Sequence, residues 1–223
     1  MIAVVDYCKG NLKSVERGLR AVGGDAHITD SPQAIAAADA VVLPGVGAFA
    51  DASATMLQTG QMQAVRAAIE AGKPFLGICL GEHLLFENGV EGAAGPGADG
   101  TVGDANLPVG LGIIPGTVAR MPNADSQGKA YKVPHVGWNS VEFAQGACPL
   151  FEGIPSGEFF YYTHSYIAPE NDFTVATTTH SVTFPCAMQK GNVFGVQFHP
   201  EKSSDAGAKV LANFLKVVEA AKG

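Results

Sequence analysis

The sequence predicts a three-layer α/β fold, in which a central, mostly parallel sheet is covered by helices and a small antiparallel sheet follows. In the first half, short apolar runs alternate with segments whose apolar residues recur at helical spacing. In the second half, segments rich in β-branched and aromatic residues are separated by turn residues. The length of 223 residues, with 47% hydrophobic and 16% charged, suits a single domain spanning residues 1–223.

The first half of the chain indicates the parallel sheet. Buried strands are expected at residues 2–5, 40–43 and 75–78. A helix is expected between Leu12 and Val22, where apolar residues recur at helical spacing before a Gly-Gly pair. A second helix is expected over residues 54–71, with apolar residues on one face. This alternation is typical of a parallel sheet covered on both faces.

The second half predicts antiparallel strands. They are expected at residues 133–141, 159–167, 173–179 and 186–198. The last of these contains Lys190-Gly191-Asn192, which is typical of a hairpin turn. A final helix is expected after Ser203-Ser204-Asp205, which would cap it. Residues 91–108 are rich in Gly, Ala and Asp and lack periodicity, so they predict an exposed loop.

The composition disfavours several classes of function. A formal net charge of −7 argues against nucleic-acid binding, because phosphate recognition needs a basic face. No apolar run reaches the roughly 18 residues of a membrane-spanning helix. The N-terminal apolar stretch is too short for a secretory signal, and the 4 cysteines form no CxxC pair, which favours a reducing, cytoplasmic location. The 6 histidines lack metal-ligand spacing, so neither a metal nor a cofactor is expected.

Cys79 has the local sequence of a catalytic nucleophile. It lies in Gly77-Ile78-Cys79-Leu80-Gly81, between an apolar strand and an apolar helical segment. This is the cysteine form of a nucleophile elbow, a sharp turn that projects the side chain from the end of a sheet and needs flanking glycines. The following helix N-terminus favours the thiolate. A lone cysteine is more often a buried structural residue, but this context favours the nucleophile.

His199 and Glu201 are the candidate partners of that cysteine. They belong to Gly195-Val196-Gln197-Phe198-His199-Pro200-Glu201, in which a strand delivers the histidine at its end. Nucleophilic catalysis needs a base near the sulfur and a third group that orients the base. A carboxylate two residues after the histidine can reach its other ring nitrogen. The HPE sequence alone is weak support, and it predicts a triad only together with the cysteine elbow.

The turn Pro44-Gly45-Val46-Gly47 is the third candidate element. It follows a predicted strand that should lie beside the Cys79 strand. Attack on an amide creates an oxyanion, which needs preorganised N–H donors, and a glycine-rich turn exposes backbone amides. Taken alone, the turn is better explained as an ordinary strand exit.

These motifs, in this order, make the sequence similar to the class I, or triad, glutamine amidotransferases. The closer resemblance is to the glutaminase subunits of imidazole glycerol phosphate synthases. It extends over nearly the whole chain and includes the strings PGVGAF and PHVGWN. The matching segments are residues 5–7, 10–11, 43–49, 75–81, 110–116, 134–139, 162–166 and 197–203.

The resemblance implies a chemistry and a set of roles. Cys79 would attack the side-chain amide of glutamine to form a thioester and release ammonia, and water would then release glutamate. His199 would act as base and then acid, and Glu201 would orient it. The oxyanion donors would be the backbone amides of Leu80 and of the Val46–Gly47 turn. The residues implied to bind glutamine are Gly45, His83, Glu91, Ser165 and Tyr166.

The resemblance also implies a partner. Ammonia would pass to a separate (β/α)8-barrel cyclase subunit in a heterodimer that makes imidazole glycerol phosphate and an aminoimidazole carboxamide ribonucleotide for histidine biosynthesis. Asn11, Trp138 and Lys202 match positions that face the cyclase. Three alternatives stay open: a glutaminase serving another acceptor, such as pyridoxal phosphate synthesis, a non-catalytic partner-binding subunit, and a cysteine peptidase of similar fold.

The chain departs from the family pattern in three places. Glu82-His83 stands where the family usually has Met-Gln, which puts the binding of the substrate amino acid in question. Residues 91–108 are longer than is usual, and Cys8 stands where glycine is frequent. We interpret the long segment as a surface insertion and Cys8 as a tolerated substitution.

Overall fold

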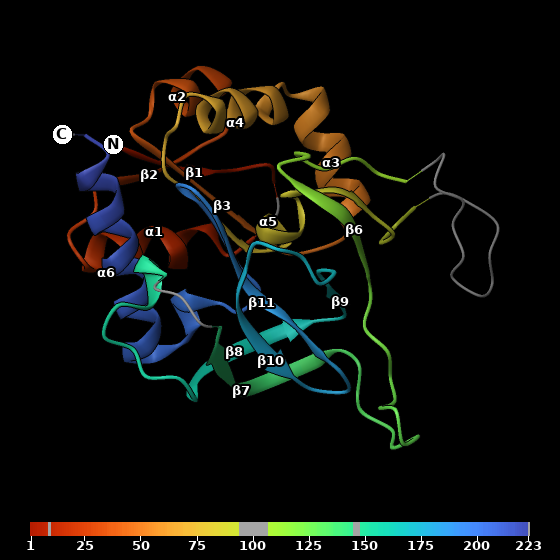
Figure 1. The fold of residues 1–223 in the computed structure, drawn as a ribbon. Helices are drawn as coiled ribbons and strands as arrows, with labels where there is room; N and C mark the ends of the chain where they lie inside the picture. Colours follow the sequence, from red (N-terminus) through yellow and green to blue (C-terminus); the bar gives the residue numbers. More distant parts are fainter. Residues whose placement is uncertain (9, 94–106, 145–147, 223) are drawn as a thin grey trace.

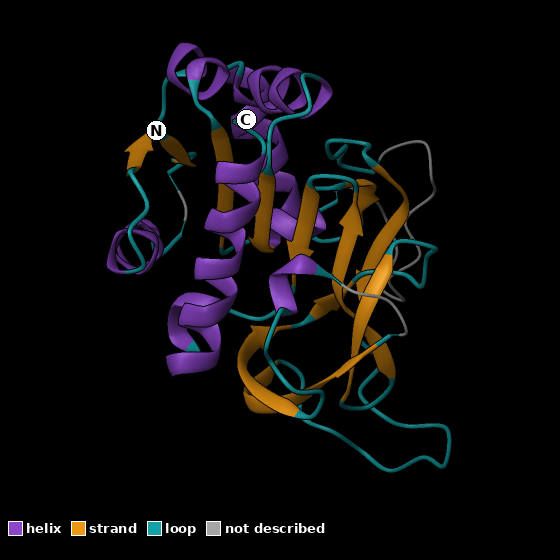
Figure 2. Ribbon diagram, turned by 60° about the vertical axis from the view of Figure 1, so that its left-hand side comes forward, coloured by secondary structure: helices purple, strands orange, loops and turns teal. Residues whose placement is uncertain are grey.

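The computed structural model describes residues 1–8, 10–93, 107–144 and 148–222. It confirms the predicted α/β fold, with helices on both faces of a nine-stranded sheet and a second sheet of three strands (Figures 1 and 2). Most of the segment 91–108 lies outside the described residues, so the expected loop is not described. None of the helices in the described ranges is long and apolar enough to cross a membrane.

The central sheet has a parallel and an antiparallel half, in the strand order β2-β1-β3-β4-β12-β11-β10-β7-β8. The parallel half contains β1 (Ile2–Val5), β2 (Ala26–Thr29), β3 (Ala40–Gly45), β4 (Phe75–Cys79) and β12 (Val193–Val196). The antiparallel half contains β7 (His135–Phe143), β8 (Glu158–His164), β10 (Thr174–Thr179) and β11 (Thr183–Lys190). The small sheet contains β5 (Phe86–Gly89), β6 (Ile114–Arg120) and β9 (Tyr166–Ile167).

The two halves are joined through β12. This strand pairs parallel with β4 on one edge and antiparallel with β11 on the other. The antiparallel strands of the second half therefore extend the central sheet, and the separate small sheet is formed by other strands. The β4–β12 register sets Gly195 beside Gly77 and Val196 beside Ile78, so the residues just after β12 lie next to Cys79.

Helices cover both faces of the parallel half. One layer consists of α1 (Leu12–Ala21) and α6 (Ser204–Ala220), and the other of α2 (Pro32–Ala37), α3 (Phe49–Gln58) and α4 (Gln61–Glu70) (Figure 1). The short helix α5 (Leu80–His83) follows β4 directly. Strand β1 is therefore buried on both faces. Ile2 and Val4 belong to one core cluster, and Ala3 and Val5 belong to the other.

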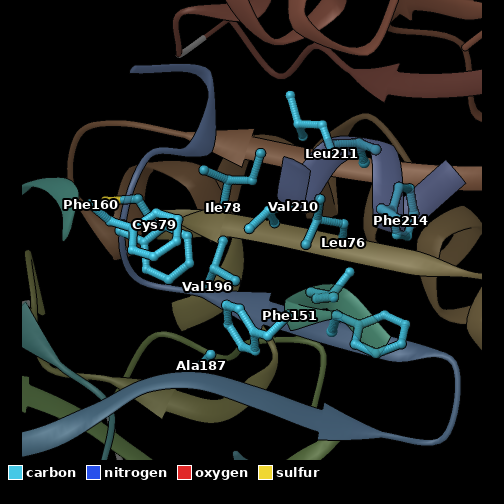
Figure 3. Close-up of a cluster of buried hydrophobic side chains, with 14 of the residues drawn as sticks. Leu76, Ile78, Cys79, Phe151, Phe160, Ala187, Val196, Val210, Leu211 and Phe214 are labelled. Carbon is cyan, nitrogen blue, oxygen red and sulfur yellow. The ribbon is translucent and has the colours of Figure 1, made fainter. Parts of the chain in front are cut away.

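The core beneath α6 fixes the strand that ends at Cys79. Leu76 and Ile78 of β4 are buried together with Val210 and Phe214 of α6 (Figure 3). Each such side chain contributes roughly 1.5–3 kcal/mol when fully buried. The same cluster extends to Cys79, so the end of β4 is held by packing and not only by strand hydrogen bonds.

Several predicted boundaries were wrong for local reasons. The helix expected over residues 54–71 is two helices, because Gly60 adopts a left-handed conformation with φ +77° between α3 and α4. The strand expected over residues 159–167 is divided between β8 and β9, which belong to different sheets. The expected hairpin at Lys190-Gly191-Asn192 is confirmed, since β11 and β12 pair there. Strands β2, β5 and β6 and helix α2 were not predicted.

The expected cap of the last helix was also wrong. Ser203 is the N-cap residue of α6, but its side chain makes no capping hydrogen bond. Its Oγ instead donates to the carbonyl oxygen of His199 at 2.7 Å and accepts from the Tyr161 N–H at 3.0 Å. Ser203 therefore ties the segment after His199 to strand β8.

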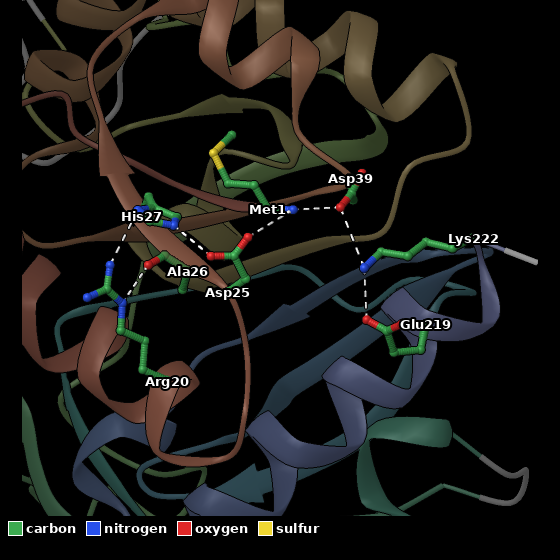
Figure 4. Close-up of polar contacts among 8 residues, drawn as sticks. All are labelled: Met1, Arg20, Asp25, Ala26, His27, Asp39, Glu219 and Lys222. Carbon is green, nitrogen blue, oxygen red and sulfur yellow. Dashed lines mark hydrogen bonds and ion pairs between the residues drawn. The ribbon is translucent and has the colours of Figure 1, made fainter.

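The two ends of the chain meet at the opposite end of the sheet. The Met1 amine lies 2.6 Å from Asp39 Oδ2, and Lys222 Nζ lies 3.5 Å from the same oxygen (Figure 4). Lys222 also lies 2.8 Å from Glu219 at the end of α6. These groups are exposed to solvent, so each pair contributes little to stability.

Candidate active site

Cys79 lies on a strained turn between β4 and α5. Its backbone has φ +54° and ψ −109°, a conformation that L-residues rarely adopt. The flanking glycines are sterically required. A Cβ on Gly77 would lie 2.4 Å from the Gly81 carbonyl oxygen, and one on Gly81 would lie 1.7 Å from that of Leu43. The predicted elbow geometry is thus observed, although α5 has only four residues.

His199 and Glu201 lie together after β12. His199 Nδ1 is 2.9 Å from Glu201 Oε1, with both side chains nearly buried, and Glu201 belongs to the 3₁₀ helix Pro200–Lys202. Nε2 of His199 is buried and makes no ordinary hydrogen bond to any described residue. Burial lowers the pKa of His199, but interactions with the Cys79 sulfur and with Glu201 outweigh it and raise the pKa to about 9. The structure therefore brings the three predicted triad residues together.

A cleft of about 400 Å³ opens at the sulfur. Cys79 is 6% exposed, and it reaches this cleft instead of being sealed in the core. The predicted site residues that line the cleft are Val46, Gly47, Leu80, His83, Glu91, Ser165 and Tyr166. The sequence did not indicate four further lining residues, Ala48, Pro134, Thr163 and His164. Pro134, Thr163 and His164 come from β7, β8 and their flanks, whose proximity to β4 depends on the sheet order. Ala48 directly precedes α3.

Gly45 is a predicted site residue that does not line the cleft. It is buried at the end of β3, where a Cβ would lie 1.9 Å from the Tyr7 hydroxyl and 3.0 Å from the Leu80 side chain. The following residues, Val46 and Gly47, are exposed in the cleft, and Gly47 has φ +101°. Gly45 therefore lets the chain pass close to Tyr7 and places the next two residues opposite the sulfur.

Among the predicted glutamine-binding residues, His83 and Glu91 have side-chain pKa values that burial shifts. Burial lowers the pKa of His83 to about 4, so its ring is neutral near pH 7. Burial raises the pKa of Glu91, and an opposing hydrogen bond comes from the Phe49 N–H, which Glu91 Oε2 accepts at 3.2 Å. Glu91 thus lies at the start of α3 and at the rim of the cleft.

Gln197 is a residue of the site that was not predicted. It is fully buried, its Nε2 donates to Cys79 Sγ at 3.7 Å, and its Oε1 lies 2.8 Å from His83 Nε2. The β4–β12 register explains this position, because it continues Val196↔Ile78 by one residue. In the sequence, Gln197 is visible only as the glutamine two residues before His199. Its position beside Cys79 follows only from the pairing of β12 with β4.

The residues predicted to face a partner lie on the surface. Trp138 of β7 is 53% exposed and packs edge-on against Tyr161 of β8 at 6.2 Å, and Lys202 Nζ lies 5.7 Å from the same ring. Asn11 is exposed immediately before α1. Two more apolar side chains, Val136 and Phe159, are 57% and 52% exposed on the same two strands.

Among the residues that the structure describes, no group of His, Cys, Asp or Glu side chains has the arrangement of a metal site. The chemistry that this site offers is nucleophilic, with a thiol, a histidine base and a buried carboxylate at the mouth of a cleft.

Comparison with known proteins identifies relatives of this chain along nearly its whole length. The sequence profile described as Glutamine amidotransferase class-I matches residues 3–218. The imidazole glycerol phosphate synthase subunit HisH of Moorella thermoacetica is 47% identical over 219 residues, covering 97% of this chain and 95% of the relative. The HisH subunit of Methanothermobacter thermautotrophicus is 42% identical over 221 residues, covering 99% and 100%.

Solved structures resemble the fold. A crystal structure of a glutamine amidotransferase aligns with a TM-score of 0.71 at 17% identity, covering 98% of this chain and 100% of that chain. The glutaminase domain of Trypanosoma brucei CTPS with bound acivicin aligns with a TM-score of 0.65 at 15% identity, covering 98% and 93%.

Proposed function

This chain belongs to the class I glutamine amidotransferase family, and from that premise we propose that it hydrolyses glutamine as the glutaminase subunit of an imidazole glycerol phosphate synthase. Such a subunit serves histidine biosynthesis. The observation that carries the proposal is the Cys79 elbow, which opens into a cleft beside the His199–Glu201 pair. The 4 cysteines are all free, which supports a cytoplasmic location.

The triad geometry supports a two-step reaction. Cys79 Sγ attacks the side-chain carbonyl carbon of glutamine, and His199 accepts the thiol proton. The proton then passes to the leaving amine, the C–N bond breaks, and ammonia departs from a γ-glutamyl thioester. Water attacks the thioester with His199 as base, and glutamate and the thiol are regenerated. Glu201 holds Nδ1 of His199 so that Nε2 serves the sulfur.

The oxyanion of each step needs donors, and two backbone sources lie at the cleft. The N–H of Leu80 begins α5 directly after the nucleophile, and the Val46–Gly47 turn lies in the cleft wall. We propose that the Val46–Gly47 peptide reorients when the partner binds its substrate, so that hydrolysis waits for an ammonia acceptor. The positive φ of Gly47 supports this, because glycine allows such a change at little steric cost.

The remaining cleft residues would bind the amino-acid end of glutamine. The Ser165–Tyr166 segment offers backbone groups on one wall, and the Glu91 carboxyl lies at the rim. His83 would take the place of the family glutamine. Gly45 would contribute by its backbone at the end of β3, since it lies beneath the cleft wall.

The exposed apolar surface on β7 and β8 would bind the (β/α)8-barrel cyclase in a heterodimer. Trp138 and Lys202 both contact the Tyr161 ring, which makes them one surface, and Asn11 would extend it. Large exposed aromatic residues are frequent anchors of protein interfaces. The ammonia released at Cys79 would pass across this interface to the cyclase.

The test compares two nitrogen sources. The chain and the cyclase are mixed with the nucleotide substrate, and product formation is followed with glutamine or with ammonium salt. Cys79→Ala is expected to abolish the glutamine-dependent reaction and leave the ammonia-dependent one intact. Retention of glutamine-dependent synthesis by Cys79→Ala would refute the role of Cys79, and failure of the chain to bind the cyclase would favour a glutaminase serving another acceptor.

A further inference from the structure

Three buried side chains form a connected chain behind the nucleophile. Glu82 and His83 belong to α5, and Gln197 follows β12. Their exposed fractions are 0%, 3% and 0%. His83 Nε2 lies 2.8 Å from Gln197 Oε1 and 3.5 Å from Glu82 Oε2, and Gln197 Nε2 donates to Cys79 Sγ at 3.7 Å. The triad described above uses none of the three.

The protonation of His83 decides which end of the Gln197 amide faces the sulfur. A neutral imidazole carries one proton, and burial lowers the pKa of His83 to about 4, so the neutral ring prevails at pH 7. If the proton is on Nε2, it is donated to Gln197 Oε1, and the amide NH₂ is directed at Sγ. If it is on Nδ1, the amide is free to reverse and present its oxygen to the sulfur, which disfavours a thiolate.

Glu82 is placed to select the first arrangement. One of its oxygens lies 3.5 Å from His83 Nε2, and neither oxygen has a hydrogen-bond partner among the described residues. When the oxygen nearer Nε2 is the acceptor oxygen of the carboxyl, it favours the tautomer with the proton on Nε2. Gly195 of β12 leaves room for this side chain, because a Cβ there would lie 2.7 Å from Glu82 Cγ.

The surroundings of Glu82 favour its uncharged form. Burial raises the pKa of its carboxyl well above its usual range, and the neighbouring Cys79 sulfur adds to the effect. The other titratable groups that face it are Cys186 of β11 and Tyr162 of β8, and neither is a cation. A neutral carboxyl without full hydrogen bonding is costly to bury. An apolar residue of similar size would therefore suit the fold better than glutamate does.

We propose that Glu82 and His83 are positioning residues that hold the Gln197 amide with its N–H groups toward Cys79, and that Gln197 thereby stabilises the thiolate. The proposal deepens the proposed function, since it concerns the same nucleophile, and rests on it. It assigns Glu82-His83, the departure from the family pattern, a part in activating the cysteine. Catalytic contact with the reacting sulfur belongs to Gln197 alone among the three.

The test measures the reactivity of Cys79 directly. In the full chain with Cys8→Ser, which removes the exposed thiol, the rate of iodoacetamide alkylation at Cys79 is followed by peptide mass spectrometry across pH. We expect Glu82→Met and Gln197→Leu each to slow alkylation at pH 7 by roughly tenfold and to move its midpoint to higher pH, because a hydrogen bond to a charged group is lost. Glu82→Gln, which keeps an acceptor oxygen, should retain most of the native rate.

Two readouts separate positioning from folding. Glu82→Met should raise the melting temperature while it lowers reactivity, which a purely structural role would not produce. The matched control is Asn213→Leu, which removes another buried amide, on α6, whose donors serve the Leu150 and Glu152 carbonyls. This control should lower the melting temperature and leave the alkylation midpoint unchanged.

The outcomes distinguish this inference from the proposed function. Tyr7, His199 and Glu201 also influence the sulfur or its partner, but they are the same in every variant, so differences report on the three-residue chain. The inference would be overturned if Glu82→Met and Gln197→Leu left the pH profile of alkylation unchanged while the Cys8→Ser parent chain hydrolysed glutamine in the presence of the cyclase. A parent complex that hydrolyses no glutamine would instead overturn the proposed function.

Discussion

Nδ1 of His199 lies 2.9 Å from Oε1 of Glu201, and the two side chains are only 3% and 2% exposed. A carboxylate at this separation and burial fixes the orientation of the imidazole and keeps a proton on Nδ1. The relationship matters for catalysis because it leaves Nε2 as the nitrogen available to the sulfur.

The first prediction concerns this pair. Glu201→Gln should reduce kcat for glutamine hydrolysis in the complex by roughly 10²–10⁴-fold, because the histidine loses the anion that orients it and stabilises its protonated form. KM for glutamine should change little, since Glu201 does not line the cleft. Steady-state kinetics with the cyclase present gives both values. A loss confined to KM would contradict the assigned role.

The second prediction concerns alkaline pH. The pKa of His199 is raised from its ordinary value of 6.5 to about 9, so the folded state binds this proton more tightly than the unfolded state. The resulting stability is fully present below about pH 6.5 and is lost as the pH rises through about 9. Urea unfolding of the native chain and of Glu201→Gln should therefore differ most below pH 6.5 and converge above pH 9. A constant difference across this range would refute the linkage.

The third prediction concerns acidic pH. Burial lowers the pKa of His164 to about 3, so the unfolded state takes up this proton first as the pH falls below about 6.5. Stability contributed by the neutral ring is therefore lost as the pH falls from about 6.5 toward 3. Between pH 6 and 4, the native chain should lose stability more steeply than His164→Asn, by up to about 1.4 kcal/mol per pH unit. If denaturant titrations gave the native chain and His164→Asn the same loss of stability per pH unit, the assigned role of His164 would be contradicted.

The fourth prediction concerns the elbow glycines. Gly81→Ala should prevent folding or cost more than about 4 kcal/mol, because its Cβ would lie 1.7 Å from the rigid Leu43 carbonyl oxygen. The control is Gly23→Ala, whose Cβ would meet nothing within 4 Å, although Gly23 itself has φ +97°. It should cost only about 1–2 kcal/mol, the strain of the left-handed conformation. Similar unfolding free energies for the two variants would show that the elbow is not sterically constrained.

The fifth prediction concerns the proposed partner surface. Trp138→Ala should weaken cyclase binding by about 2 kcal/mol or more, roughly thirtyfold, and leave the stability of the chain within about 0.5 kcal/mol. Leu57→Ala on α3 is the matched control, because Leu57 is 41% exposed but lies in the other helix layer. Calorimetric titration with the cyclase measures the binding affinity of both variants. Equal effects of the two variants would place the interface elsewhere.

The sequence by itself determined the local parts of this protein. The apolar alternation predicts the parallel strands, because residues buried on both faces of a sheet leave an uninterrupted apolar run. Gly77, Cys79 and Gly81 predict the elbow, because the turn admits no side chain at the flanking positions. His199 and Glu201 are two residues apart, so their pairing follows from short-range geometry. These features depend on neighbours in the chain, and the residue types alone indicate them.

Only the tertiary structure decided which distant segments meet. The parallel pairing of β12 with β4 brings Gln197 and His199 to Cys79, and no local pattern specifies that pairing or its register. The same pairing makes the antiparallel strands an extension of the central sheet and buries Glu82 behind the nucleophile. Strand order is set by the packing of the whole core. Nothing in the sequence shows that the charged residue Glu82 is fully buried, and only the assembled sheet encloses it behind the nucleophile.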